Sequence, residues 1–329
     1  MTLDDRIKKD LENLYDSGIL EYIRRFKGCK INEAEQLSKA LFGNSNEFST
    51  HGLPGYFVGN RDAQTVMVML NPGTDVISQN NPFVTERTLN KLKINTGAPD
   101  VFVKSFKEGS RNFGDLDVVD EGKDKGRIRL DNFDIKQAAF LKAWDDSDVV
   151  IPDEFPDMVT NMPPRRSKDQ KEKLNDLLRK VKREVLLNKL QLELVPYASR
   201  EFKSISDDKM HFLFPYVETL FEEIFRCKRK YVIFCSDFFE RLFRMYTNDE
   251  HYPGIIDIDL DKKQSMQLLN KGKAYCTPIT IKYAGEAMTS INAVIAHTFP
   301  NKSLPNAYEK MKDYGEFCFK VYNSYKNKK

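Results

Sequence analysis

Three polar side chains stand at or near the ends of short apolar runs: the carboxamide of Asn71, the carboxylate of Glu193 and the imidazole of His297. A proline follows each of them within three residues, which is typical of a strand that ends in a turn. Such groups can position a water molecule, hydrogen-bond a polar substrate and stabilise the charge that develops when a bond breaks. The sequence therefore predicts a cleft in which one small substrate is within reach of all three groups.

Buried strands have to position these groups. The run Val66–Leu70 holds five consecutive apolar residues beside a turn, which is the pattern of a strand covered on both faces in a parallel sheet. Ligands of open α/β sheets usually bind at the carboxyl ends of such strands. We therefore expect Asn71-Pro72-Gly73 to form the floor of a pocket whose opposite wall carries His297. Three further strands are expected at 190–195, 231–235 and 291–296.

Each motif has a simpler explanation when it is taken alone. Asn71-Pro72-Gly73 is a good turn sequence in any protein, since proline fixes its own φ and glycine permits positive φ. A single histidine such as His297 is more often structural than catalytic, and Glu193 also fits a solvent-facing strand position. The functional interpretation depends on the three motifs standing at corresponding strand ends.

Amphipathic helices alternate with the strands in the second half of the chain, which is typical of an α/β fold. Residues 277–283 alternate in polarity like an edge or antiparallel strand, whereas the polar segment 248–273 is expected to be irregular. A short strand at 55–59 leads into the first core strand. Helices are expected at 4–26, 32–42, 133–144, 212–226, 237–246 and 305–325.

A long insertion, at about 76–184, separates the first core strand from the next one and far exceeds an ordinary connection of about 2–6 residues. Within it, residues 163–183 carry nine basic and three acidic residues, a local charge of +6. This stretch is either a solvated helix face or a patch that contacts phosphates in a salt-dependent way.

The bulk composition excludes several classes of protein. Lys and Arg number 52 against 49 Asp and Glu, so the net charge is only +3 and a nucleic-acid surface has to be local. The five cysteines include no Cys-x-x-Cys pair, which argues against a disulfide framework or a clustered metal site and fits a reducing compartment. No apolar run approaches the roughly 18 residues of a membrane span. We expect a cytoplasmic protein that needs no metal or cofactor.

The motifs Met69–Gly73 and His297–Asn301, together with the order of strands and helices between them, resemble the uracil-DNA glycosylase superfamily. The likeness is greatest to the mismatch-specific branch, whose first motif is a buried strand that ends in Asn-Pro-Gly. The resemblance covers residues 53–80 and 185–320. It implies a three-layer α/β/α fold around a mainly parallel four-stranded sheet at 51–329, interrupted by the insertion at 76–184 and preceded by a helical extension at 1–50.

The resemblance also implies an activity, hydrolysis of the N-glycosidic bond of a uracil-like or modified base in DNA, as in DNA repair. Asn71 orients the water that attacks the sugar C1′, and His297 donates a hydrogen bond to the leaving base. The base is flipped out of the helix into a pocket. We expect the base to be held by Gly73, Glu193, Phe83 and Phe140. The alternative for the two phenylalanines is a place in the hydrophobic core. The residues expected to contact nucleic acid are Arg165, Arg166, Lys168, Ser199, Asn301 and Lys302.

Several residues depart from the family pattern. Asn71 replaces the acidic water activator of another branch and so implies a positioning role. The second motif lacks a His-Pro-Ser or His-Ser-Pro sequence, so it does not by itself imply the family's hydroxyl contact to a DNA phosphate. Glu193 stands where many members read uracil with an asparagine, and a carboxylate there is expected to accept from an exocyclic amino group, which favours a cytosine-like, adenine-like or modified base.

Two other functions fit the same sequence. The fold can serve as a catalytically inactive module that binds nucleic acid or a nucleotide, or as an enzyme that acts on a free nucleoside, which the modest net charge favours. The sequence leaves open whether DNA is single- or double-stranded and whether the protein forms oligomers.

Overall fold

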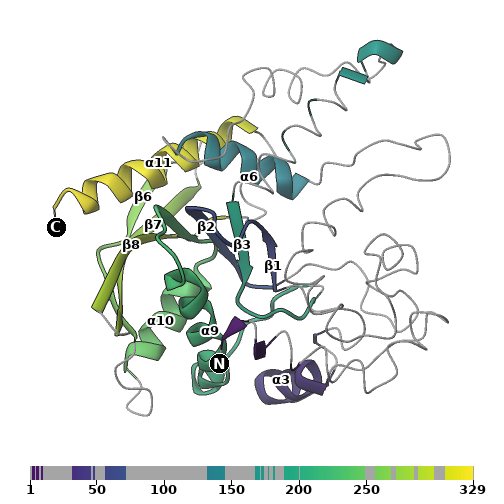
Figure 1. Ribbon diagram of the computed structural model, residues 1–329, viewed down its shortest axis with the longest axis vertical. Helices are drawn as coiled ribbons and strands as arrows, with labels where there is room; N and C mark the ends of the chain where they lie inside the picture. The colour runs from purple at the N-terminus through teal and green to yellow at the C-terminus, as the bar shows by residue number, and fades with distance from the viewer. Residues whose placement is uncertain are drawn as a thin grey trace.

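A computed structural model of the chain shows a mixed sheet between two groups of helices (Figure 1). The strands are β1 (Phe57–Gly59), β2 (Thr65–Met69), β3 (Lys189–Glu193), β4 (Tyr231–Phe234), β5 (Ile256–Leu260), β6 (Gln264–Gln267), β7 (Lys273–Ala284) and β8 (Met288–Ala296). The helices are α3 (Asn32–Phe42), α6 (Asn132–Lys142), α9 (Phe214–Phe225), α10 (Phe238–Asn248) and α11 (Tyr308–Lys326), with a 3₁₀ helix, η3, at Asp207–Leu213. The structure describes residues 2–3, 5–6, 9, 32–45, 47–48, 56–71, 132–144, 167–170, 172–173, 177, 181, 189–199, 201–248, 256–267, 272–284, 288–299 and 308–328.

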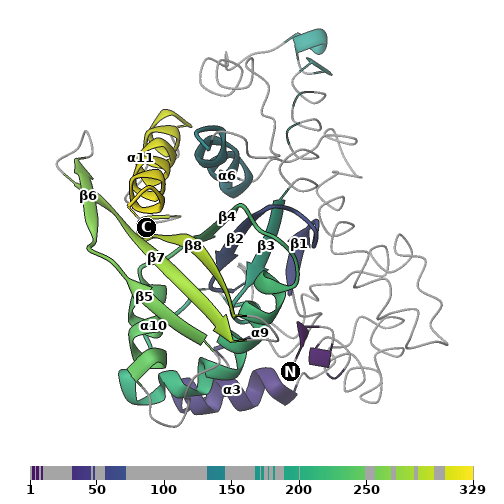
Figure 2. The same ribbon diagram turned by 60° about the vertical axis from the view of Figure 1, so that its left-hand side comes forward.

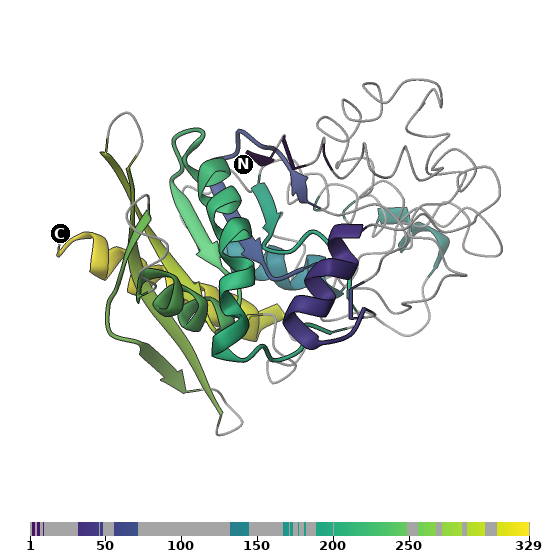
Figure 3. The same cartoon turned by 90° about the horizontal axis from the view of Figure 1, so that it is seen from below.

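Four neighbouring strands form a parallel block in the order β3-β2-β4-β8. The four predicted core strands are thus parallel neighbours as expected, but the sheet they belong to is mixed, not mainly parallel. The complete sheet is larger, because β1 pairs antiparallel with β3, and β7 pairs antiparallel with β8, β5 and β6. Figure 3 shows the antiparallel strands β5–β7 on the side of the sheet away from β1.

The prediction of an irregular segment at 248–273 is therefore wrong, since it contains β5 and β6. Both strands lie outside the parallel block and are partly exposed to water. Their polar residues therefore resemble the composition of a loop. In β5 the burial alternates from residue to residue, as expected for a half-covered strand. Strand β7, predicted at 277–283 as an edge or antiparallel strand, is antiparallel and lies between β8 and β5.

Alternate residues of the buried strands face two separate cores, because successive strand side chains point to opposite sides of the sheet. On β2, Val66 and Val68 pack in the cluster that includes residues of α3, α9 and α10. Met67 and Met69 pack in the cluster with α6 and α11. The sheet thus separates two helical layers, which are visible on either side of it in Figure 2.

Helix α6 belongs to one of these layers although its sequence lies within the predicted insertion. Phe140 is fully buried, and its ring centroid lies 5.6 Å from that of Tyr314 on α11. The two helices approach so closely that a Cβ on Gly315 would lie 2.2 Å from the carbonyl oxygen of Phe140. The absence of a side chain at Gly315 is therefore what lets the backbones of α6 and α11 pack together.

Helix α3 contributes to the opposite layer. Leu37 and Leu41 are buried in the same cluster as Val66. The hydroxyl of Ser38 accepts hydrogen bonds from the backbone N–H groups of residues 47 and 48, at 3.0 Å each, which ties the following turn to the helix. Helix α3 and Phe48 are thus part of the core that supports the sheet, whereas most of the helix expected at 4–26 lies outside the described residues.

Candidate functional site

The carboxyl ends of the four parallel strands meet at one edge of the sheet. Met69 is paired with Glu193, and Val68 with Phe234, which in turn is paired with Ile295. The residues that follow these pairs therefore leave the sheet at nearly the same level. This confirms the expectation that the three strand-end motifs share one edge.

Asn71 lies two residues beyond the end of β2, and its amide group is held in one orientation. The Nδ2 atom donates to the carbonyl oxygen of Tyr197 at 3.1 Å and to Oγ of Ser199 at 2.7 Å. The hydroxyl of Ser199 donates in turn to the carbonyl oxygen of Glu201 at 2.9 Å. Because Nδ2 faces the loop that follows β3, Oδ1 points away from these two partners. Ser199 is buried and supports Asn71, instead of lying on an exposed surface where DNA could contact it.

Glu193 is the last residue of a polar row on one face of β3. Nζ of Lys189 donates to Oε1 of Gln191 at 3.1 Å, and Nε2 of Gln191 donates to Oε1 of Glu193 at 2.6 Å. Burial raises the pKa of Glu193 to about 8, against the lowering effects of Gln191 and Lys189. The group therefore carries a proton at neutral pH. Burial thus favours the neutral acid over the carboxylate that the sequence predicted at this position.

His297 follows β8 and is buried between β7 and α10. Its Nε2 atom lies 2.8 Å from Oγ1 of Thr277 and 3.3 Å from Oε2 of Glu240. Burial of the imidazole and the nearby charge of Lys263 lower the pKa of His297 to about 4. The carboxylates of Glu240 and Asp237 oppose this shift. His297 is thus neutral at pH 7, and its Nδ1 atom has no hydrogen-bond partner among the described residues.

The expected single cleft has to be corrected, because Glu193 and His297 face opposite layers. Leu192 and Leu194 pack on the α9 and α10 side of β3, so the Glu193 carboxyl, which bonds to Gln191, belongs to the other face of the strand, although Glu193 also borders a pocket on the α9 side at the strand end. His297 reaches Glu240 on α10. The sequence predicted that the strands end at a common edge, but not the exact residue at which each strand ends. That residue determines on which face of the sheet the following side chain lies.

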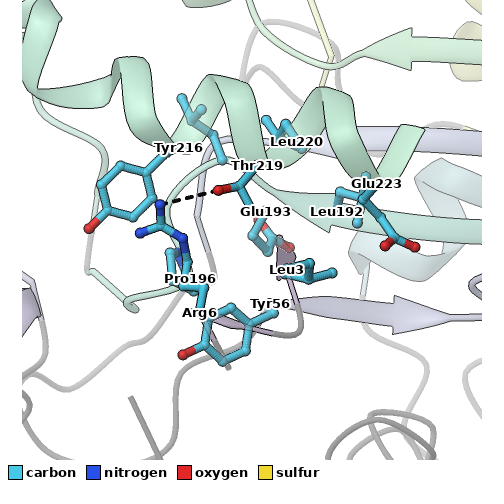
Figure 4. A pocket seen from close by; sticks show the side chains of 11 residues that line it. Leu3, Arg6, Tyr56, Leu192, Glu193, Pro196, Tyr216, Thr219, Leu220 and Glu223 are labelled. Atoms are coloured by element: carbon cyan, nitrogen blue, oxygen red, sulfur yellow. Dashed lines mark hydrogen bonds between the residues drawn. The ribbon is translucent and has the colours of Figure 1, made fainter. Parts of the chain in front are cut away.

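A pocket borders the end of β3 on the α9 side, and the Arg6 side chain lies within it (Figure 4). The guanidinium of Arg6 donates to Oγ1 of Thr219 at 3.2 Å and lies 4.0 Å from the ring centroid of Tyr216. Glu223, another lining residue, forms ion pairs with Arg61 and with Arg226. The pocket is separate from Asn71 and His297, neither of which lines it. Its lining residues are Leu3, Arg6, Tyr56, Leu192, Glu193, Leu194, Pro196, Tyr216, Thr219, Leu220 and Glu223.

Of the remaining predicted site residues, Phe140 and Lys168 lie within the described part of the chain. Phe140 is fully buried, and its ring centroid lies 6.0, 5.3 and 5.6 Å from those of Trp144, Phe299 and Tyr314. It is therefore a core residue, which was the alternative to a role in holding the base. Lys168 is exposed on a helical stretch at 168–170. Outside the described residues lie Gly73, Phe83, Arg165, Arg166, Asn301 and Lys302.

Sequence reasoning missed several residues that shape the site. Glu240 and Thr277 come from α10 and β7, and nothing in their local sequence indicates that they meet His297. Lys189 and Gln191 did leave a signal, since two polar residues at a spacing of two in a strand with apolar neighbours mark one face of that strand. The same alternation could have assigned Glu193 to their face.

The described residues hold no group of three or more His, Cys, Asp or Glu side chains placed to bind a metal ion. Among the helices described, none combines the length and the apolar character needed to cross a bilayer. Comparisons of the chain with protein-family models, with curated proteins and with solved structures found no match in any of the three.

Proposed function

We propose that this protein is a DNA glycosylase-like hydrolase that cleaves an N-glycosidic bond, with Asn71 and His297 on the two sides of the reacting sugar. One observation carries the proposal: these residues follow β2 and β8, two parallel strands with β4 between them. Neighbouring strands lie about 4.8 Å apart, so the two strand ends are separated by about 10 Å.

This separation suits hydrolysis of a glycosidic bond. When water attacks the sugar from the face opposite the leaving group, the two assisting groups lie about 6.5–9.5 Å apart to leave room for that water. The contacts of both side chains lie on the outer sides of their strands, Asn71 toward the loop after β3 and His297 toward Thr277 of β7, so the space over the end of β4 is left for the sugar and the water. The sugar would then lie above the end of β4, at Ser236 and Asp237.

Asn71 would position the attacking water. Its amide is fixed through Tyr197 and Ser199, and Oδ1 is thereby directed away from the β3 loop. A carboxamide is not a strong base, but an oxocarbenium-like sugar needs a well-placed water more than a strongly activated one.

His297 would stabilise the negative charge that develops on the leaving base. A neutral imidazole keeps its N–H proton at pH 7 and can donate it in a hydrogen bond. The tautomer with a proton on Nδ1 uses Nε2 to accept from Thr277 and leaves Nδ1–H for the base. Glu240 favours a proton on Nε2, and Lys263 and Arg244, each 2.9 Å from one of its carboxylate oxygens, offset part of this effect.

The decisive experiment is incubation with oligonucleotides that contain uracil, hypoxanthine or modified cytosines, followed by mass spectrometry of released bases. The wild type should release at least one base, and Asn71→Ala should abolish release while DNA binding persists. Asn44→Ala, at an exposed position after α3, is the matched control and should behave as wild type. DNA binding without release by any variant would instead identify a binding module.

A free nucleoside is the second candidate substrate, and the exposed carboxylate of Asp237 favours it. Asp237 follows β4, between the strands that carry Asn71 and His297, where its charge would repel a DNA backbone. Release of base from uridine, cytidine or inosine, combined with weak and salt-insensitive DNA binding, would select this alternative.

A further inference from the structure

Arg6 is a buried cation, only 8% exposed, and it pairs with no carboxylate in the described part of the chain. Its Nη2 atom donates to the carbonyl oxygen of Pro215 at 3.1 Å and to Oγ1 of Thr219 at 3.2 Å. The Nε atom is buried and has no hydrogen-bond partner among the described residues. The ring of Tyr216, whose centroid lies 4.0 Å from the guanidinium carbon, compensates the charge only in part.

A buried guanidinium calls for an opposite charge. An arginine side chain does not release its proton in a protein, so it cannot escape the cost of burial by becoming neutral. An ion that is taken out of water without a partner costs far more free energy than a paired one. Buried charges in proteins are therefore paired, and the partner of Arg6 has to be found.

The two carboxyl groups that line the pocket with Arg6 do not supply this charge. Burial raises the pKa of Glu193 to about 8, so Glu193 is neutral at pH 7. Glu223 is ionised, but its carboxylate is already shared by three other arginines: Arg61, Arg226 and Arg229. The protein groups that border the pocket thus leave the charge of Arg6 uncompensated.

The pocket that Arg6 borders limits the size and the charge of a counter-ion. Its volume is about 20 Å³, which is room for one water molecule or one ion of similar size. Much of the wall is apolar and includes Leu3, Leu192 and Leu220 (Figure 4). Sulfate and phosphate are too large for this space, and a second negative charge would make their desolvation more costly. A halide has one atom and one charge, and it meets both limits.

We propose that the pocket between Arg6, the end of β3 and α9 binds one small monovalent anion, chloride in the cell, as the counter-ion of Arg6. Leu3 and Arg6 come from the start of the chain and Thr219 comes from α9, so the bound ion would hold the first residues of the chain against this helix. Neither Asn71 nor His297 lines the pocket. The anion site is therefore independent of the proposed hydrolysis.

The dependence of stability on chloride tests the proposal at constant ionic strength, with gluconate, which is too large for the pocket, replaced stepwise by chloride. Each tenfold rise in chloride above its dissociation constant should raise the ratio of folded to unfolded wild type about tenfold, as expected for one ion that binds only the folded state. The melting temperature should rise accordingly, and bromide should act like chloride. A wild type that melts at the same temperature in gluconate and in chloride would overturn the proposal.

Two variants of similar shape identify Arg6 as the site of the effect. Thr219→Asp places a carboxylate where Oγ1 now lies 3.2 Å from Nη2 of Arg6, so it should supply the counter-ion itself and abolish the response to chloride. Thr219→Asn is neutral and should keep the response. Arg241→Gln is the control at an exposed arginine that already pairs with Asp207, and it should also respond like the wild type. Equal responses of the two Thr219 variants, or a lost response in Arg241→Gln, would contradict the assignment.

Bromide soaked into crystals of the full-length wild type would locate the ion directly and does not depend on whether a variant folds. Anomalous scattering should show a bromide ion in the pocket beside the guanidinium of Arg6, and this peak should be absent from Thr219→Asp. Bromide found solely at exposed lysines and arginines, an adventitious ion only, would overturn the proposal.

Discussion

Replacement of Glu193 by glutamine should make the protein more stable, and the gain should grow with pH. Burial raises the pKa of Glu193 from 4.5 to about 8 in the folded state. Between these two pH values the folded protein keeps the proton while the unfolded chain releases it. The stability contributed by the neutral acid is therefore complete below pH 4.5 and is lost as the pH rises through about 8. Glutamine does not titrate, so the variant escapes this loss.

The magnitude follows from the size of the shift. Each pKa unit corresponds to about 1.4 kcal/mol, so the penalty of the wild type reaches about 3 kcal/mol at pH 7 and about 5 kcal/mol above pH 8. These are upper values, because rearrangement or water entry around an ionised Glu193 would reduce them. The amide can also take the place of the neutral acid toward Gln191, whose Nε2 already donates to Oε1.

Urea denaturation at pH 4.5, 7 and 9 would measure the effect. We expect similar free energies of unfolding for wild type and Glu193→Gln at pH 4.5, and a difference of several kcal/mol in favour of the variant at pH 9. Glu201→Gln is the matched control, because Glu201 is exposed and its carboxylate meets water in both states. A difference that is constant with pH, or a variant less stable than wild type at pH 9, would refute the reasoning.

Two further predictions concern the other side of the edge and the opposite core. Burial lowers the pKa of His297 from 6.5 to about 4, so the free energy of unfolding should fall by at most about 3 kcal/mol as the pH drops from 6.5 toward 4. In thermal melts a His297→Gln variant should lack this part of the acid sensitivity. A variant with the same pH profile as the wild type would contradict the prediction. Gly315→Ala should destabilise the protein by about 2 kcal/mol or more, because its methyl group would lie 2.2 Å from the backbone oxygen of Phe140. A matched Ser324→Ala change on the exposed side of α11 should have little effect on the melting temperature. A Gly315→Ala variant as stable as wild type would show that the two helices can move apart at no cost.

The parallel part of the sheet was predictable because its signal is local. A run of apolar residues such as Val66–Leu70 needs cover on both faces, and only a central strand receives it. The positions of Asn71 and His297 at one edge follow directly, since parallel strands end together. The helix at 32–42 could be recognised from its own periodicity, and the one expected at 133–144 from four apolar residues close together in the sequence.

Other features depend on information that is not local in sequence. The face occupied by Glu193 depends on where β3 leaves the sheet, and the environment of His297 depends on Glu240 and Thr277, which are distant in the chain. Strands β5 and β6 are polar because water covers part of them, so their composition resembles that of a loop. Phe140 is a core residue because α11 packs against it through Tyr314, and the sequence of α6 alone does not indicate which helix is its partner.

The close packing of α6 on α11 has a consequence for synthesis of the chain. Helix α6 ends at Lys142, and helix α11 begins at Tyr308. At about 5–20 residues per second, a ribosome needs roughly 10 to 30 s to add the residues between them. Once α9, β4 and α10 have been added, late in this interval, α3, α9 and α10 can pack on the other side of β2 and β4, whereas α6 still has no α11 to cover it. The α6 side of the sheet is thus where a nascent chain is most open to chaperones and to aggregation.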